Sequence, residues 1–164
     1  MNVTFDEVLE ANKESIYRIC RIYAVHPIEP KDLFQEVVYE LWKSFSTFEG
    51  RASVSTWVYR IALNVGLRSK MKLQRSNDKV VRWPSIQWIS DTNHDADDQE
   101  EKYQALRNCI EGLNEADQSI VVLFLEELPY KEIAAVTGLT ENHIAVKMKR
   151  IRKKLFDCIS QKLG

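Results

Sequence analysis

The residues best suited to chemistry in this sequence lie near its C-terminus, where cations follow a helix-turn-helix spacing. Ala134, Gly138 and Ile144 are separated by four and six residues. The small alanine lets two helices cross closely, the glycine tolerates a positive φ in the turn, and the isoleucine holds the second helix against the first. Thr140 then begins a second helix whose early turns fit the major groove of DNA and whose N-terminus faces phosphate.

This second helix carries a high density of positive charge. Residues 147–154 hold six basic side chains in eight. Lys147, Arg150 and Lys154 share one side of a helix, where they suit phosphates and base edges. Charge alone is equally compatible with a solvated helix face. Together with the helix-turn-helix spacing, it predicts that this half of the chain binds DNA.

A second group of functional residue types lies in the N-terminal half. Between residues 50 and 75 the sequence has six basic residues and no acid. The mixture of aromatic, hydroxyl, amide and cationic side chains suits single-stranded DNA, whose bases stack on rings while cations follow the backbone. An aromatic residue on a helix is more often part of a core, which is the alternative for Trp57. The group comprises Phe48, Arg51, Ser53, Thr56, Trp57, Tyr59, Arg60 and Asn64.

Polar side chains also gather on one side of the helix that precedes this group. Asp32, Gln35, Glu36 and Tyr39 lie on its polar side, opposite an apolar face. They could present acids to a basic partner, and an ordinary solvated face explains them as well.

Helices are expected to position all of these groups. The chain has 164 residues, of which 45% are hydrophobic and only nine are glycine or proline, and its apolar residues recur with a helical period. We therefore expect an all-α protein with two small helical domains, over residues 1–75 and 99–164, joined by a linker over 76–98. Thr4, Asn114 and Thr140 are the expected N-caps, and Ser53, Ser55 or Thr56 caps a third N-terminal helix.

The linker has an unusual composition. Residues 76–101 carry two basic and seven acidic side chains, whereas the flanking segments are slightly basic. Trp83 and Trp88 would be costly to expose in a free tether, so we expect this segment to dock, most simply on its own domain.

Several classes of protein are excluded or disfavoured. No apolar run is long enough to span a membrane, and the first residues lack the pattern of a secretory signal. Cys20, Cys109 and Cys158 are odd in number and far apart, which suits reduced thiols in the cytoplasm. The histidines and cysteines lack metal-ligand spacing, and neither a catalytic motif nor a glycine-rich phosphate loop is present. We therefore expect no enzyme activity, no cofactor and no metal.

Two stretches resemble a known family, and they occur in that family's order. Residues 32–72 closely resemble region two of the extracytoplasmic-function (ECF) sigma factors of bacterial RNA polymerase, a group of the sigma-70 superfamily. Residues 113–155 resemble region four of the same proteins, and the acidic linker falls where this group lacks a middle domain. The resemblance implies a transcription initiation factor that binds core RNA polymerase and directs it to specific promoters.

The resemblance also implies roles for individual residues. The surface that grips the clamp helices of the largest polymerase subunit matches Asp32, Gln35, Glu36, Leu41 and Trp42. The surface that captures a flipped base and holds the start-proximal promoter element matches Phe48, Arg51, Ser53, Thr56, Trp57, Arg60, Asn64 and Arg68. The recognition helix for the upstream promoter element matches Thr140, Asn142, His143, Val146, Lys147, Lys149, Arg150 and Lys154. This helix departs from that of many relatives, so base preference is not carried over.

The resemblance implies one further partner and leaves one rival function. A membrane-anchored anti-sigma factor would hold the chain inactive, while the chain itself does not enter the membrane. The rival is a dimeric helix-turn-helix regulator that binds duplex DNA without polymerase. That reading accounts for residues 113–155 but not for the base-capture group at 48–68.

Overall fold

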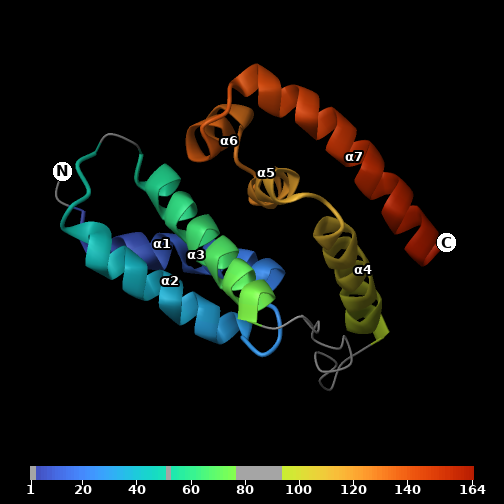
Figure 1. Ribbon diagram of the computed structural model, residues 1–164, viewed down its shortest axis with the longest axis horizontal. Coiled ribbons are helices and arrows are strands. Elements are labelled where there is room, and N and C mark those ends of the chain that lie inside the picture. Colours follow the sequence, from blue (N-terminus) through green and yellow to red (C-terminus); the bar gives the residue numbers. More distant parts are fainter. Residues whose placement is uncertain (1–2, 51–52, 77–93) are drawn as a thin grey trace. The chain divides into compact units, whose positions relative to one another are not determined.

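The structure is a computed structural model that describes residues 3–50, 53–76 and 94–164. These residues form seven α-helices, and no strand occurs among them, which confirms the all-α expectation (Figure 1). Within these ranges no helix is both long enough and apolar enough to cross a membrane. Contacts divide the chain into two units, Met1–Arg82 with Ala135–Gly138, and Trp83–Ala134 with Leu139–Gly164.

The first unit is built on three helices that pack against one another, α1 (Phe5–Tyr23), α2 (Pro30–Phe45) and α3 (Val54–Ser76). Apolar residues at helical spacing face its centre and are almost completely buried, which removes their apolar surface from water. The largest contributors from α1 and α2 are Ile16, Ile19, Tyr23, Leu33 and Leu41, and α3 adds Val58, Ala62 and Val65.

The starts of these helices follow the expected capping chemistry. The Thr4 hydroxyl accepts from the Glu7 N–H and the Glu7 carboxylate accepts from the Thr4 N–H, both at 3.2 Å, so the predicted capping box is confirmed. Pro30 occupies the first turn of α2, where its missing N–H costs nothing. Ser53 is the residue that caps α3, because its Oγ accepts from the Thr56 N–H at 3.1 Å.

A glycine allows α1 and α3 to approach closely. A Cβ added at Gly66 would lie 2.9 Å from Cγ of Tyr23, which is buried in the core. We expect Gly66→Ala to lower the free energy of unfolding of this unit by about 1–3 kcal/mol, because overpacking outweighs the better helix propensity of alanine. Thermal melting against Lys72→Ala, an exposed change on the same helix, measures the effect. An unchanged or raised melting temperature would show that Tyr23 moves aside freely.

The second unit is built around α7 (Glu141–Leu163), which packs along α4 (His94–Glu111) and α5 (Glu115–Leu125). It also contains the first part of α6 (Tyr130–Thr137). Figure 1 shows α7 running beside α4. The buried side chains that hold these helices together include Ile110, Ile120, Leu123, Ile133, Ile144, Met148 and Ile151.

The helix starts of this unit, and the turn that precedes α7 in the sequence, also match the sequence analysis. Asn114 accepts from the Asp117 N–H at 2.8 Å, and Thr140 accepts from the His143 N–H at 3.1 Å, so both expected N-caps are confirmed. Gly138 adopts a φ of +83°, which a side chain would strain, as the helix-turn-helix spacing predicts.

The predicted linker is shorter than its composition suggests. α4 begins at His94, inside the predicted 76–98 segment and before the expected start near Gln99. The acid-rich sequence from Asp95 onward reads as a tether, but acids in a first turn favour a helix N-terminus. The expected docking of Trp83 and Trp88 lies outside the described residues.

The cysteines differ from the expectation. Cys109 of α4 and Cys158 of α7 form a disulfide, so the prediction of three reduced cysteines is wrong. The pair is 49 residues apart in sequence, and only the packing of α7 on α4 brings it together. Cys20 is free and buried, and desolvation, with a smaller contribution from Glu36, raises the pKa of its thiol to about 12.

Candidate nucleic-acid and partner interfaces

The recognition helix presents two distinct sides. Ile144, Met148, Ile151 and Leu155 are buried and fix one side of α7 against the unit. The opposite side is open to solvent, and Val146 is 62% exposed there. A β-branched residue slightly lowers helix propensity, and an exposed one buries no apolar surface, so helix stability does not explain this valine. The predicted upstream-element residues that lie exposed are Thr140, Asn142, His143, Val146, Lys149, Arg150 and Lys154.

Lys147 differs from the other predicted DNA-binding cations. Its side chain is only 19% exposed, and its Nζ lies 3.4 Å from Oδ1 of Asp117, a residue of α5 that is 1% exposed. The Arg150 guanidinium lies 3.5 Å from Oδ2 of the same carboxylate, but its side chain remains 53% exposed. The structure therefore directs Lys147 toward α5, while Arg150 has donors left for an outside partner.

The sequence did not identify Asp117 as a residue of this surface. It occupies the third position of a helix capped by Asn114, where an acid is explained by the helix dipole alone. Its two cations stand 30 and 33 positions later, so no local spacing connects them.

A further cation of the basic run is held within the unit. The Arg152 guanidinium lies 4.7 Å from the centre of the Phe124 ring, and its Nη2 lies 3.4 Å from the Tyr130 hydroxyl. The run at 147–154 is therefore not a uniform solvated stripe. Its outward-facing charge comes mainly from Lys149, Arg150, Lys153 and Lys154.

Four predicted start-proximal residues meet at the N-terminus of α3. The Trp57 ring is half-buried, at 5.0 Å from the Phe48 ring and 6.1 Å from the Phe45 ring. Thr56 is 4% exposed, and the Ser53 Oγ lies 2.8 Å from its Oγ1. Thr56 and Trp57 thus also serve the fold, as the core alternative for Trp57 anticipated. Arg51 lies outside the described residues.

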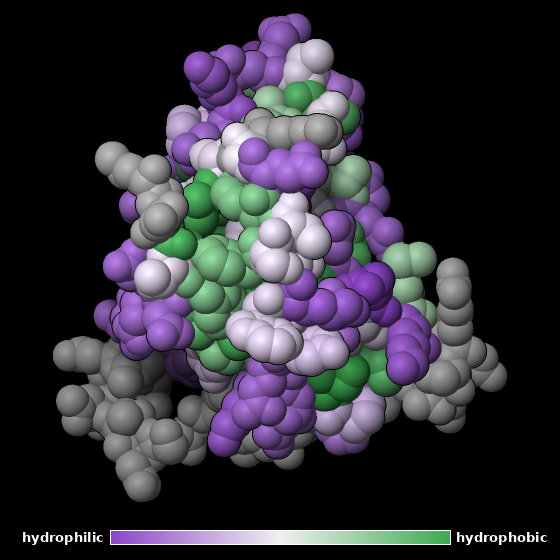
Figure 2. All heavy atoms as spheres, turned by 90° about the vertical axis from the view of Figure 1, so that its left-hand side faces the viewer, coloured by the Kyte–Doolittle hydropathy of each residue, from purple (hydrophilic) through white to green (hydrophobic). Residues whose placement is uncertain are grey.

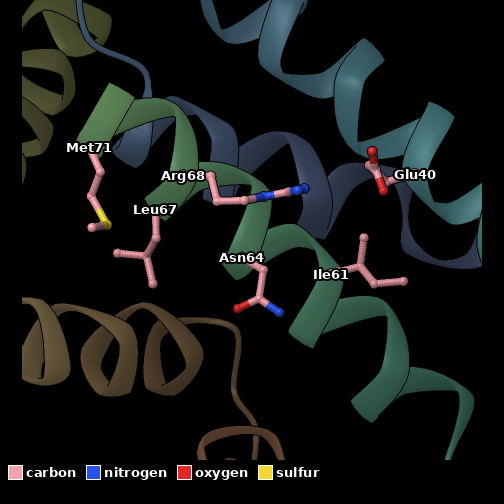
Figure 3. A pocket seen from close by; sticks show the side chains of 6 residues that line it. All are labelled: Glu40, Ile61, Asn64, Leu67, Arg68 and Met71. Carbon is pink, nitrogen blue, oxygen red and sulfur yellow. The ribbon is translucent and has the colours of Figure 1, made fainter. Parts of the chain in front are cut away.

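Farther along α3, three predicted residues are exposed at helical spacing. Arg60, Asn64 and Arg68 are each separated by four residues, which places them along one side of the helix. Asn64 and Arg68 border a hollow of about 470 Å³ whose floor is largely apolar. Figure 3 shows both side chains projecting from α3, with Glu40 contributed by α2. The residues that line the hollow are Glu40, Ile61, Asn64, Leu67, Arg68 and Met71.

α2 has an exposed face that combines acids with aromatic rings. Asp32, Gln35 and Glu36 are exposed, and Tyr39 and Trp42 continue the same face with 57% and 64% of their surface exposed. Figure 2 shows one face of the molecule with hydrophobic residues at its centre and hydrophilic ones around them. A ring beside carboxylates suits a partner with basic and apolar groups.

Leu41 does not belong to that face. It is 1% exposed and packs in the core, so the prediction that it contacts polymerase is wrong for a folded unit. Leu33, Val37 and Leu41 follow one another at four-residue intervals and are all buried. The resemblance placed Leu41 beside Trp42, but the helical period separates the two.

Family comparisons cover most of the chain. The Sigma-70 region 2 family matches residues 8–76, and the Sigma-70 region 4 family matches residues 103–155. RNA polymerase sigma factor SigV of Bacillus subtilis is 24% identical over 146 residues, which is 87% of this chain and 82% of the relative. ECF RNA polymerase sigma factor SigX of the same species is 24% identical over 162 residues (94% and 83%). ECF RNA polymerase sigma factor RpoE of Cereibacter sphaeroides is 27% identical over 136 residues (77% and 72%).

Solved structures share the fold at lower sequence identity. The sigma factor RpoE, in complex with the anti-sigma factor NepR from Bartonella quintana, has a TM-score of 0.74 at 17% identity, covering 95% of this chain and 96% of that one. CnrH, in complex with the cytosolic domain of CnrY, has a TM-score of 0.68 at 17% identity, covering 96% and 88%. With both regions matched in order and ECF proteins among its relatives, the chain belongs to the sigma-70 family as an ECF sigma factor.

Proposed function

We propose that this ECF sigma factor binds core RNA polymerase through α2, opens the start-proximal promoter element with α3 and the residues before it, and reads the upstream element with α7. The observation that carries the proposal is the presence of two cationic helical faces, on α3 and α7, in units matched by regions 2 and 4. A duplex-binding regulator needs only the second of them. Catalysis of RNA synthesis is left to the polymerase, and the chain acts in the cytoplasm, where that enzyme works.

The proposed polymerase-binding surface consists of Asp32, Gln35, Glu36 and Trp42. Their exposure leaves both the carboxylates and the indole free to bury against a partner. Clamp helices that carry basic and apolar side chains would pair with the acids and cover the ring, since buried aromatic anchors dominate interface energies.

The proposed start-proximal surface follows α3 from its N-terminus. The Phe48 and Trp57 rings offer stacking, and Arg60 and Arg68 offer charge for the displaced strand. Asn64 supplies an amide with both donor and acceptor at the rim of the hollow in Figure 3. Extruding a base costs a few kcal/mol, which an anchored complex offsets.

The proposed upstream surface is the exposed side of α7. Asn142 and His143 stand in its first turn, Val146 offers an apolar contact for a thymine methyl group, and Lys149 and Arg150 provide charge. The acid-rich stretch at 76–101 lies between the two DNA-binding halves in sequence, and a net charge of −1 limits the affinity of the free chain for DNA.

Regulation by an anti-sigma factor is part of the proposal. Of the solved structures described above, that of RpoE is a complex with the anti-sigma factor NepR, and that of CnrH is a complex with the cytosolic domain of CnrY. An anti-sigma factor anchored in the membrane would cover the polymerase-binding and DNA-binding faces until a signal releases the chain.

Promoter opening tests this proposal. On a promoter found by run-off transcription of genomic fragments, permanganate should modify start-proximal thymines only when the chain and core polymerase are both present. Opening by polymerase without the chain, or tight duplex binding by the chain with no initiation, would favour the regulator instead.

A further inference from the structure

The recognition helix is tied to α5 by a single buried carboxylate. Asp117 is 1% exposed, and its two oxygens face different cations of α7: Oδ1 lies 3.4 Å from Lys147 Nζ, and Oδ2 lies 3.5 Å from Arg150 Nη2. The Asn114 side chain accepts from the Asp117 N–H, which fixes the backbone that carries the carboxylate. One acid therefore contacts two of the cations that face or flank the proposed DNA-binding side.

The two ion pairs differ in a way that matters for DNA. Lys147 is mostly buried, so its charge is used within the unit. Arg150 is half-exposed, and Asp117 Oδ2 accepts no hydrogen bond among the described residues, so this pair is a charge contact at 3.5 Å. The guanidinium has five donors and keeps most of them available, while its position is biased by the carboxylate.

A helix N-terminus favours an acid, but burying that acid carries an energetic cost. Taking a carboxylate out of water is unfavourable, and an apolar pair of similar volume is often as stable as a buried ion pair. The carboxylate also cancels part of the positive charge that would attract any phosphate backbone.

We propose that Asp117 is a specificity-determining positioning residue of the upstream-element surface. It holds Arg150 in one orientation for base edges, and it withdraws Lys147 from sequence-independent phosphate contacts. The acid thereby lowers affinity for arbitrary DNA and raises discrimination. This inference rests on the proposed function, because it assumes that α7 contacts the upstream element.

The test compares Asp117→Asn with the unchanged chain in two measurements at several salt concentrations. The first is the affinity of the chain for duplex DNA without a promoter. The second is initiation by the holoenzyme on a promoter with an intact or a scrambled upstream element. The matched control is Glu115→Gln, an exposed acid of the same turn that undergoes the same change of charge.

The expected result has opposite signs in the two measurements. Affinity for non-promoter DNA should rise, and its logarithmic salt slope should steepen by about 1–2, since each released cation that meets a phosphate adds about 0.9. Discrimination between intact and scrambled elements should fall by about 5-fold to 150-fold, the range for losing one well-placed base contact. Asp117→Glu should restore part of the discrimination, and Glu115→Gln should leave it unchanged.

Two outcomes would overturn the inference. If both affinity and discrimination fall, Asp117 only supports the fold; if neither changes, it has no role at the surface. If Asp117→Asn fails to fold, the double variant Asp117→Leu with Lys147→Met takes its place, because it replaces the buried ion pair by apolar groups. Arg150 then has no carboxylate partner at position 117, so this variant must show the same loss of discrimination. If the unchanged holoenzyme itself ignores the upstream element, the proposed function fails, and that failure is visible before any variant is compared.

Discussion

Reversing two charges on α2 is expected to abolish binding to core RNA polymerase. In Asp32→Arg with Glu36→Arg, two exposed carboxylates on one helical face become cations. Like charges brought together at an interface cost several kcal/mol, so the affinity for core polymerase should fall more than about 100-fold and initiation should be lost. Titration of labelled chain with core polymerase measures the change.

The control for this prediction has the same geometry on a neighbouring helix. Glu10 and Glu14 are exposed on α1 and also stand four residues apart, so Glu10→Arg with Glu14→Arg makes the same change in net charge. This control should bind core polymerase within a few-fold of the unchanged chain. Equal binding by the α2 variant would remove α2 from the polymerase interface.

Removing the Arg150 side chain is expected to have the second-largest effect. Arg150→Ala deletes the exposed guanidinium at the centre of the proposed upstream surface. Initiation on promoters that depend on the upstream element should fall about 5-fold to 150-fold, corresponding to about 1–3 kcal/mol for a well-placed base contact. Binding to core polymerase should not change, because that surface is on α2. Run-off transcription and the core titration together measure both quantities.

Arg150→Ala also removes an ion-pair partner of the buried Asp117, so its effect on stability needs a control. Without Arg150, Oδ2 of the buried Asp117 loses its ion-pair partner, so part of the loss could come from the fold. Lys153→Ala removes an exposed cation of the same helix and should cost little. Thermal melting of both variants separates stability from DNA contact. An Arg150→Ala variant that initiates normally from such promoters would take Arg150 out of the upstream surface.

The sequence predicted the features that depend on local chemistry. The Thr4 capping box, the Asn114 and Thr140 caps and the positive φ of Gly138 involve residues within a few positions of one another, and the structure confirms each. The burial of Ile144, the residue expected to hold the second helix of the motif, is confirmed as well. The resemblance to sigma regions two and four predicts the family, and the comparisons confirm it.

The features that sequence reasoning missed depend on distant residues. The Cys109–Cys158 disulfide and the pairing of Asp117 with Lys147 arise only when α7 packs on α4 and α5. The misplacement of Leu41 has a different cause. A surface carried over from a family is a stretch of sequence, but a helix exposes only part of any stretch, and Leu41 lies on the buried part.

The most direct test of the account measures DNA discrimination by the chain with and without core polymerase. The quantity is the ratio of affinities for promoter and non-promoter duplex at a fixed salt concentration near 0.15 M. The account predicts a ratio close to one for the chain alone and at least about 1,000 for the holoenzyme, the lower end for specific DNA recognition. A chain that discriminates equally well without polymerase would contradict the account.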